Sequence, residues 1–95
     1  MLSELPKDFQ RTLVAKSHTL RPVVMIGIHG LTENVHNEVD AALTKHELIK
    51  MRISSTTKEV RAQMITELAT RHKAYVIHQI GHTIVLYRSK KDSPK

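Results

Sequence analysis

Residues 22–35 read PVVMIGIHGLTENV and join an apolar run to two glycines and the start of a helical pattern. The run Pro22–Gly27 is continuous and rich in β-branched residues, which is typical of a strand covered on both faces, so we place it near the middle of a sheet. From Leu31 to Leu43 apolar residues recur about every four positions, which predicts an amphipathic helix with Thr32 as its N-cap. A strand, a glycine turn and a helix in this order indicate the first part of a β-α-β unit.

Periodic patterns continue on both sides of this segment. Apolar residues at helical spacing predict a first helix from about Lys7 to His18. Alternation predicts a strand within His46–Ile53, with one covered face. Its solvent side would carry Lys50 and Arg52, so this side of the sheet is expected to be basic.

The C-terminal half predicts a helix and a β-hairpin. Thr56 and Glu59 have the spacing of a capping box, and the apolar stripe that follows predicts a helix ending near His72. The β-rich runs Tyr75–Ile80 and Thr83–Arg88 are separated by a glycine and a histidine, which is a short hairpin connection. The element order is then α-β-α-β-α-β-β. Two successive β-α-β units imply parallel pairing and the hairpin adds an antiparallel strand, so we expect an α/β (two-layer α+β) fold with a mixed four-stranded sheet and packed helices.

Composition narrows the classes of function. The 95 residues are enough for one compact domain, which we place at residues 1–88, with a flexible basic tail at 89–95. The 15 Lys and Arg residues outnumber the 9 Asp and Glu residues and favour a polyanionic partner. Because the chain has no cysteine, thiolate nucleophiles, disulfides and cysteine-based zinc sites are excluded. No export signal or membrane-spanning run is visible, so we expect a cytoplasmic protein without membrane contact.

The loop Gly27-Ile-His-Gly30 is the most informative local feature. Its glycines allow a tight turn and let a phosphate or ribose approach the main chain closely. The helix that follows directs unpaired N–H groups and the positive end of its dipole at the loop. A purely steric explanation stays open, because strand-to-helix turns with two glycines are common. KH domains also clamp nucleic-acid backbone with a GXXG loop, but theirs lies between two helices, so the KH interpretation fits poorly.

Three separated motifs resemble the CRM (chloroplast RNA splicing and ribosome maturation) domain. They are residues 22–35, His46-Glu-Leu-Ile-Lys50 and Ile80-Gly-His-Thr-Ile-Val-Leu-Tyr-Arg88, within a resemblance that spans about Leu2 to Arg88. In length the chain is similar to the stand-alone bacterial YhbY type. The resemblance implies a fold similar to the C-terminal domain of translation initiation factor 3, association with precursors of the large ribosomal subunit, RNA contact through the glycine loop, and no catalysis.

One departure from the family pattern concerns the charge of the loop. Family loops usually carry Lys or Arg between the glycines, whereas Ile28 and His29 stand there in this chain. A histidine side chain is mostly neutral at pH 7, so this loop would offer main-chain donors and little charge. The positive charge would then come from nearby surface residues.

Four basic residues are candidates for that surface. Lys50 and Arg52 project together from the second strand, Arg21 precedes the first strand, and Lys45 lies just before the second, near the sheet and loop. Each could equally be ordinary solvated surface. The predicted RNA-binding residues are Gly27, Ile28, His29, Gly30, Thr32, Arg21, Lys45, Lys50 and Arg52.

Catalytic and metal sites find little support in the sequence. The seven histidines include no HExxH motif, His72, His78 and His82 lack the fixed helical spacing of a zinc site, and no G-x-S-x-G is present. We therefore predict no catalytic residue, no metal or other cofactor, and no small-molecule substrate. Tyr75 and Tyr87 could stack on bases, although packing against the first helix is the favoured alternative.

The sequence thus favours a monomeric, non-catalytic RNA-binding protein that acts on large-subunit rRNA during ribosome assembly. The alternative is a protein-interaction adaptor that docks on a ribosomal protein or assembly factor through an apolar surface. Salt separates the two hypotheses, because only RNA binding is expected to weaken steeply with ionic strength.

Overall fold

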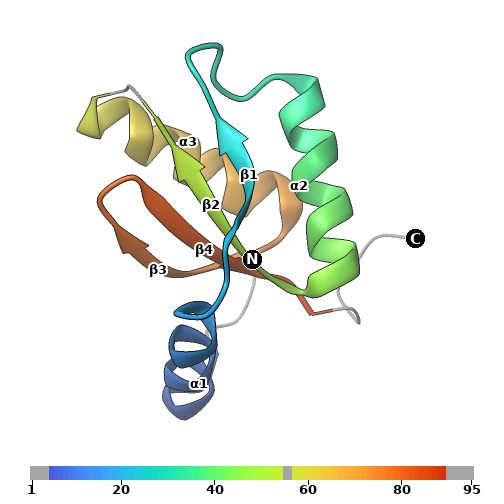
Figure 1. Ribbon diagram of the computed structural model, residues 1–95, viewed down its shortest axis with the longest axis vertical. Coiled ribbons are helices and arrows are strands. Elements are labelled where there is room, and N and C mark those ends of the chain that lie inside the picture. Colours follow the sequence, from blue (N-terminus) through green and yellow to red (C-terminus); the bar gives the residue numbers. More distant parts are fainter. Residues whose placement is uncertain (1–4, 55–56, 90–95) are drawn as a thin grey trace.

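The computed structural model describes residues 5–54 and 57–89. The elements are α1 (Lys7–Ser17), β1 (Pro22–Ile26), α2 (Glu33–His46), β2 (Leu48–Ile53), α3 (Lys58–His72), β3 (Tyr75–Ile80) and β4 (Thr83–Tyr87). The predicted order and the mixed four-stranded sheet with packed helices are confirmed (Figure 1). Apart from Ser89, the predicted tail lies outside the described residues. None of the described helices combines the length and apolar character needed to cross a bilayer.

The sheet order is β1-β2-β4-β3, which differs in one respect from the expectation. β1 pairs in parallel with β2 as predicted. β2 and β3 do not pair, because β4 lies between them and is antiparallel to both. Ile84, Val85 and Leu86 are at most 1% exposed, so β4 buries consecutive side chains on both faces and is stable only at the centre of the sheet. The hairpin therefore turns back into the sheet instead of extending its edge.

β1 is an edge strand, so its predicted central position is wrong. Val24 and Ile26 are buried, whereas Val23 and Met25 are 50% and 62% exposed. The core requires only alternate residues of this strand, and the apolar residues between them face outward. Pro22 at the first position agrees with an edge, because proline cannot donate a hydrogen bond to a second neighbour.

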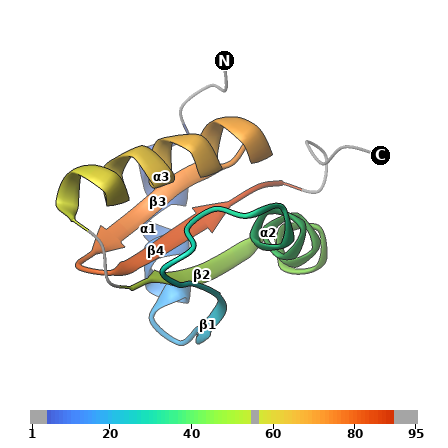
Figure 2. The ribbon, with the colours of Figure 1, turned by 90° about the horizontal axis from the view of Figure 1, so that it is seen from above.

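Two helices cover one face of the sheet and the third covers part of the other. Val39 and Leu43 of α2 and Leu68 of α3 join the apolar cluster formed by the inward residues of the strands. Figure 2 shows α3 lying along β3 and β4, with α2 viewed end-on. On the outer face, Phe9 of α1 meets Tyr87 edge to face, with ring centroids 5.4 Å apart. Packing of the tyrosine against the first helix is thus confirmed.

The two helices on the core side begin at threonine caps. The Thr32 hydroxyl accepts a hydrogen bond from the Val35 N–H at 3.2 Å, as predicted. At α3 the cap is Thr57, whose hydroxyl accepts from the Val60 N–H at 3.1 Å. The predicted capping box with Thr56 as the cap is therefore wrong by one position, and Thr56 itself lies outside the described residues.

Arg88 ties both core-side helices to the end of the sheet. Its side chain is 1% exposed, and its guanidinium donates to Asp40 Oδ1 at 3.0 Å and to Thr44 Oγ1 at 3.0 Å in α2. It also donates to the backbone oxygens of Asp40 and His72, each at 3.2 Å. One side chain therefore fixes the middle of α2 relative to the C-terminal end of α3.

Arg88→Met should lower the free energy of unfolding by about 3 kcal/mol, because it leaves Asp40 and two backbone oxygens without their buried cationic donor. Urea unfolding followed by circular dichroism measures this loss. Arg11→Met, at a side chain that is 80% exposed, serves as the matched control and should stay within about 0.5 kcal/mol of wild type. A loss below about 1 kcal/mol for Arg88→Met would contradict the role of this network.

Candidate nucleic-acid interface

The turn after β1 is built around Gly30. Its N–H donates to the Gly27 carbonyl oxygen at 3.1 Å, which closes a turn with Ile28 and His29 at the tip. Gly30 has φ +70°, in the left-handed region, and an added Cβ would lie 3.3 Å from Met64 Cε. The backbone conformation therefore favours glycine at this position, and a larger residue would also need a small shift of the Met64 side chain.

Neither backbone conformation nor packing requires glycine at position 27. It is not among the residues with positive φ, and an added Cβ would find no atom within 4 Å. The steric explanation of the two glycines therefore accounts for Gly30 alone. At Gly27 the missing side chain leaves the main chain at the end of β1 open to close approach by a ligand.

The positive end of α2 lies directly behind the turn. The Thr32 N–H donates to the Gly30 oxygen at 3.1 Å, which joins the turn to the helix cap. The first N–H groups of a helix have no acceptor within the helix, and Thr32 satisfies that of Val35. The remaining donors and the helix dipole favour an anion at this end.

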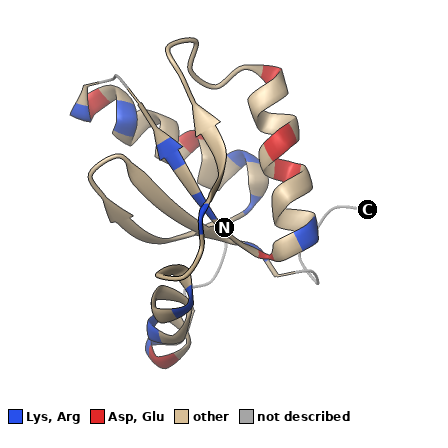
Figure 3. Cartoon of the chain, in the orientation of Figure 1, with Lys and Arg blue, Asp and Glu red and all other residues tan. Residues whose placement is uncertain are grey.

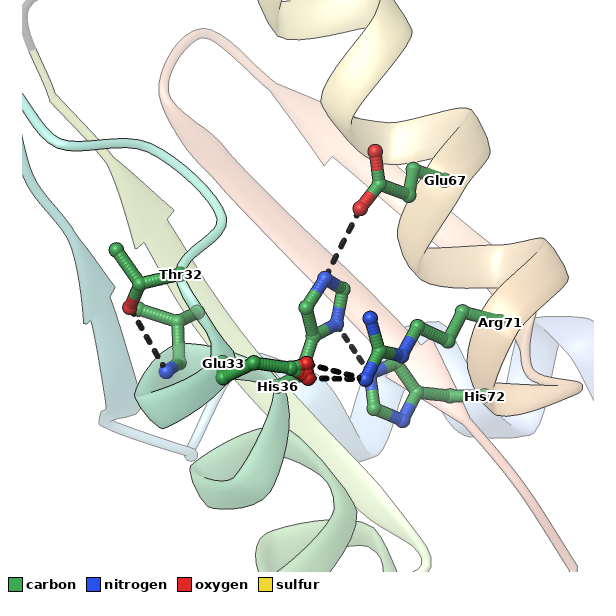
Figure 4. Close-up of polar contacts among 7 residues, drawn as sticks. Thr32, Glu33, His36, Glu67, Arg71 and His72 are labelled. Atoms are coloured by element: carbon green, nitrogen blue, oxygen red, sulfur yellow. Dashed lines mark hydrogen bonds and ion pairs between the residues drawn. The ribbon is translucent and has the colours of Figure 1, made fainter.

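Glu33 is the acidic residue in the first turn of α2, and α3 neutralises it. Arg71 Nη2 donates to both of its carboxylate oxygens, at 2.5 and 2.7 Å (Figure 4). The hydrogen bond from Arg71, followed by the charge of Arg71, holds the pKa of Glu33 below its usual value. The carboxylate is thus drawn toward α3, and its repulsion of a phosphate near the loop is reduced.

A buried pair of histidines joins the same two helices one turn further along α2. His36 Nε2 lies 2.9 Å from Glu67 Oε2, and His36 Nδ1 lies 2.9 Å from His72 Nε2 (Figure 4). Because the ionised carboxylate only accepts, His36 donates through Nε2 and accepts at Nδ1 from His72. His36 and His72 are 3% and 6% exposed, so this relay satisfies polar groups that would otherwise be buried without partners.

The predicted basic residues lie at separate places in the fold, and the Lys and Arg positions are blue in Figure 3. Arg52 is exposed near the end of β2, beside the loop end of β1. Lys50 and Arg21 lie together at the opposite end of β1. Lys45 lies in the last turn of α2, about 20 Å along the helix axis from the loop, so its expected position near the loop is wrong.

The outer face of the sheet has no acidic residue in its strands. None of β1, β2, β3 and β4 contains Asp or Glu (Figure 3). Met25 pairs with Arg52 in the register, and both side chains are exposed on this face. Sequence reasoning missed Met25 as a surface residue because it assigned the whole run to the interior. Proline at the start of β1 was the available signal for an edge strand.

Residues that position the interface were also missed. Arg71 and His72 belong to α3 and His36 belongs to α2, and contacts between two helices cannot be read from helical spacing alone. Groups of three or more His, Cys, Asp or Glu residues arranged to hold a metal ion do not occur in the described part of the chain.

The histidine relay should make stability depend on pH. Burial, and then the nearby His36, lower the pKa of His72 below the usual 6.5. The unfolded chain therefore takes up a proton at this residue at higher pH than the folded chain. Stability should be complete above about pH 7.5 and fall as the pH drops through 6.5 toward the folded pKa.

Urea midpoints measured at about pH 7.5 and 5.5 test this dependence. His72→Gln should reduce the fall in the urea midpoint between these two pH values, because the group whose pKa is lowered by burial is removed. His18→Gln, the same change at an exposed histidine, should keep the wild-type drop. Equal pH dependence in wild type and His72→Gln would contradict this role of His72.

Comparisons with known proteins find relatives in sequence and in fold. The chain is 39% identical over 92 residues to an RNA-binding protein of Haemophilus influenzae, covering 97% of this chain and 90% of that protein. It is 30% identical over 84 residues to a Bacillus subtilis protein named Probable RNA-binding protein YqeI, covering 88% of each. A hypothetical protein of Staphylococcus aureus, assigned as a candidate RNA binder, has a solution structure that matches with a TM-score of 0.78 at 27% identity, over 90% of each chain.

The family model of the CRS1/YhbY (CRM) domain matches residues 5–88, which include every helix and strand that the structure describes. Motif order, fold and relatives therefore agree, and the chain belongs to the CRS1/YhbY (CRM) domain family.

Proposed function

We propose that the chain binds RNA without catalysing a reaction, and that it does so on precursors of the large ribosomal subunit. Residues 1–88 form the binding domain, which acts as a cytoplasmic monomer. The loop Gly27–Gly30 and the Thr32 cap hold the sugar-phosphate backbone, while Arg52, Lys50 and Arg21 supply charge along β1. Lys45 lies too far from the loop to share this contact.

Gly27 is the observation that carries the proposal. Nothing in the fold requires glycine there, yet Gly27 begins the turn that leads through Gly30 and Thr32 into the positive end of α2. The nearby Glu33 carboxylate is held by Arg71. An open main chain, helix N–H donors and a neutralised carboxylate together suit a phosphate group.

RNA as the polyanion is supported by the relatives, which are named as RNA-binding proteins. The formal net charge of +6 agrees with such a partner. Contacts to backbone through a turn and a helix end would recognise RNA shape more than base sequence.

The adaptor hypothesis has one specific observation in its favour. Met25, Ile28 and Ile80 are 62%, 81% and 63% exposed, and exposed apolar side chains of this size are common in protein-protein interfaces. Binding to a protein through these residues would depend little on salt. For RNA binding, the logarithm of the association constant would fall linearly with the logarithm of the salt concentration.

Gly27→Asp should weaken binding to a large-subunit rRNA fragment by about tenfold or more, because it places a carboxylate where the phosphate is proposed to lie. Fluorescence anisotropy across a salt series measures affinity and salt dependence together. The free energy of unfolding should change by less than about 1 kcal/mol, since a Cβ added at Gly27, which is exposed, meets no atom within 4 Å.

Gln63→Glu is the matched control, because it makes the same change in charge on an exposed position of α3. Its affinity for the fragment should stay close to wild type. Equal affinity of wild type and Gly27→Asp, or binding that is insensitive to salt, would count against the proposal.

In cell extracts, the wild-type protein should sediment with large-subunit precursors at low salt and leave them at high salt. Gly27→Asp should be absent from these fractions, and it is preferred to a Gly30 variant because Gly30 is required by the turn itself. Sucrose gradients followed by crosslinking to identify bound RNA provide the measurement. Sedimentation as free protein or in a protein-only complex would favour the adaptor.

A further inference from the structure

A groove lies on the outer face, between α1 and the start of β1 and β2. Its volume is about 590 Å³, within the range of about 300 to 1,000 Å³ that is typical of ligand pockets. Leu20, Val23 and the rings of Phe9 and Tyr87 supply apolar lining. Val23 is 50% exposed and Phe9 is 37% exposed, so apolar surface remains accessible after α1 has packed on the sheet.

Positive charge surrounds this apolar lining. Lys16 comes from α1, Arg21 from the connection to β1, and Lys50 from β2. Glu47 is the single carboxylate among the lining residues. Three cations brought together from three segments therefore favour an anionic ligand with an apolar part.

The groove is continuous with the proposed RNA contact at the loop. β1 begins at the groove and ends at Ile26, so the loop that starts at Gly27 lies about 15 Å from the groove for a strand of this length. Met25 and Arg52 lie side by side between the two, and the strands beneath carry no carboxylate. An extended polyanion that leaves the loop thus meets Arg52 near the end of β1 and the groove cations at its start.

We infer that the groove binds an unpaired nucleotide of the same RNA that the loop holds. The base lies against Val23 and the ring of Phe9, and the flanking phosphates lie near Lys16, Arg21 and Lys50. Unpaired bases bind by stacking on aromatic and apolar side chains. A fully paired duplex would offer only phosphates here, because its bases face inward, and would leave the apolar lining uncovered.

This inference rests on the proposed function but has a separate test. Two labelled RNAs are compared, a hairpin that the protein binds and the same hairpin with a short single-stranded extension. The wild-type protein should bind the extended RNA about tenfold more tightly. Val23→Asp, which places a carboxylate in the groove, should remove this advantage, measured for each variant as the ratio of its affinities for the two RNAs.

Val76→Asp is the matched control, because Val76 is 40% exposed on the other edge strand, β3, away from the groove. It should keep the tenfold advantage. Lys16→Gln provides a second test on an exposed helix position and should reduce the advantage without disturbing β1. A photoreactive base in the extension should crosslink to α1 or to the start of β1.

Equal wild-type affinity for the two RNAs would overturn the groove assignment and leave the proposed function standing. Failure to bind either RNA would instead overturn the proposed function. An advantage that persists in both Val23→Asp and Lys16→Gln would exclude the groove as the nucleotide site, and loss of a protein partner in the same variants would assign it to protein binding.

Discussion

Packing of the strands against α2 and α3 is the interaction on which the remaining geometry depends. Val24 and Ile26 of β1 and Ile49 of β2 are buried in one apolar cluster with side chains of both helices. This packing fixes the parallel alignment of β1 and β2, so the C-terminal ends of both strands lie at the same end of the sheet. The chain must leave β1 at that end of the sheet and turn back into α2. The packing of the core therefore brings the loop and the positive end of the helix together.

The contacts between α2 and α3 have an electrostatic consequence beyond holding the helices together. A glutamate near a helix N-terminus stabilises the helix dipole but repels an anion at the same end. Arg71 pairs with Glu33 and leaves the dipole contribution in place while reducing the repulsion. The histidine relay, one turn further along, keeps α3 close enough for this pairing. The site near the loop therefore depends on residues that never approach it themselves.

Sequence patterns predicted the seven elements because each has a clear period or a capping residue. Apart from the cap of α3, which lies one residue later than predicted, the errors concern tertiary position. Val23 and Met25 have the composition of a buried strand, but exposed apolar residues of an edge strand cannot be distinguished in sequence from those that face a core. The place of β4 between β2 and β3 follows from burial on both faces, which a short apolar run alone does not establish. Lys45 is close to the second strand in sequence, yet the length of α2 separates it from the loop.

The distribution of charge around the loop follows from the same constraints. Ile28 is 81% exposed at the tip, where the family resemblance would place a basic residue, and it offers no charge to a phosphate. Main-chain N–H donors fix the position of a phosphate but release few counterions, so they contribute little to long-range attraction. The cations that can provide this attraction lie along β1 and at its far end, on a face whose strands carry no carboxylate. If the loop positions the backbone and the strand face attracts it, the RNA must extend along β1, and the apolar side chains exposed there become contacts instead of a liability for aggregation.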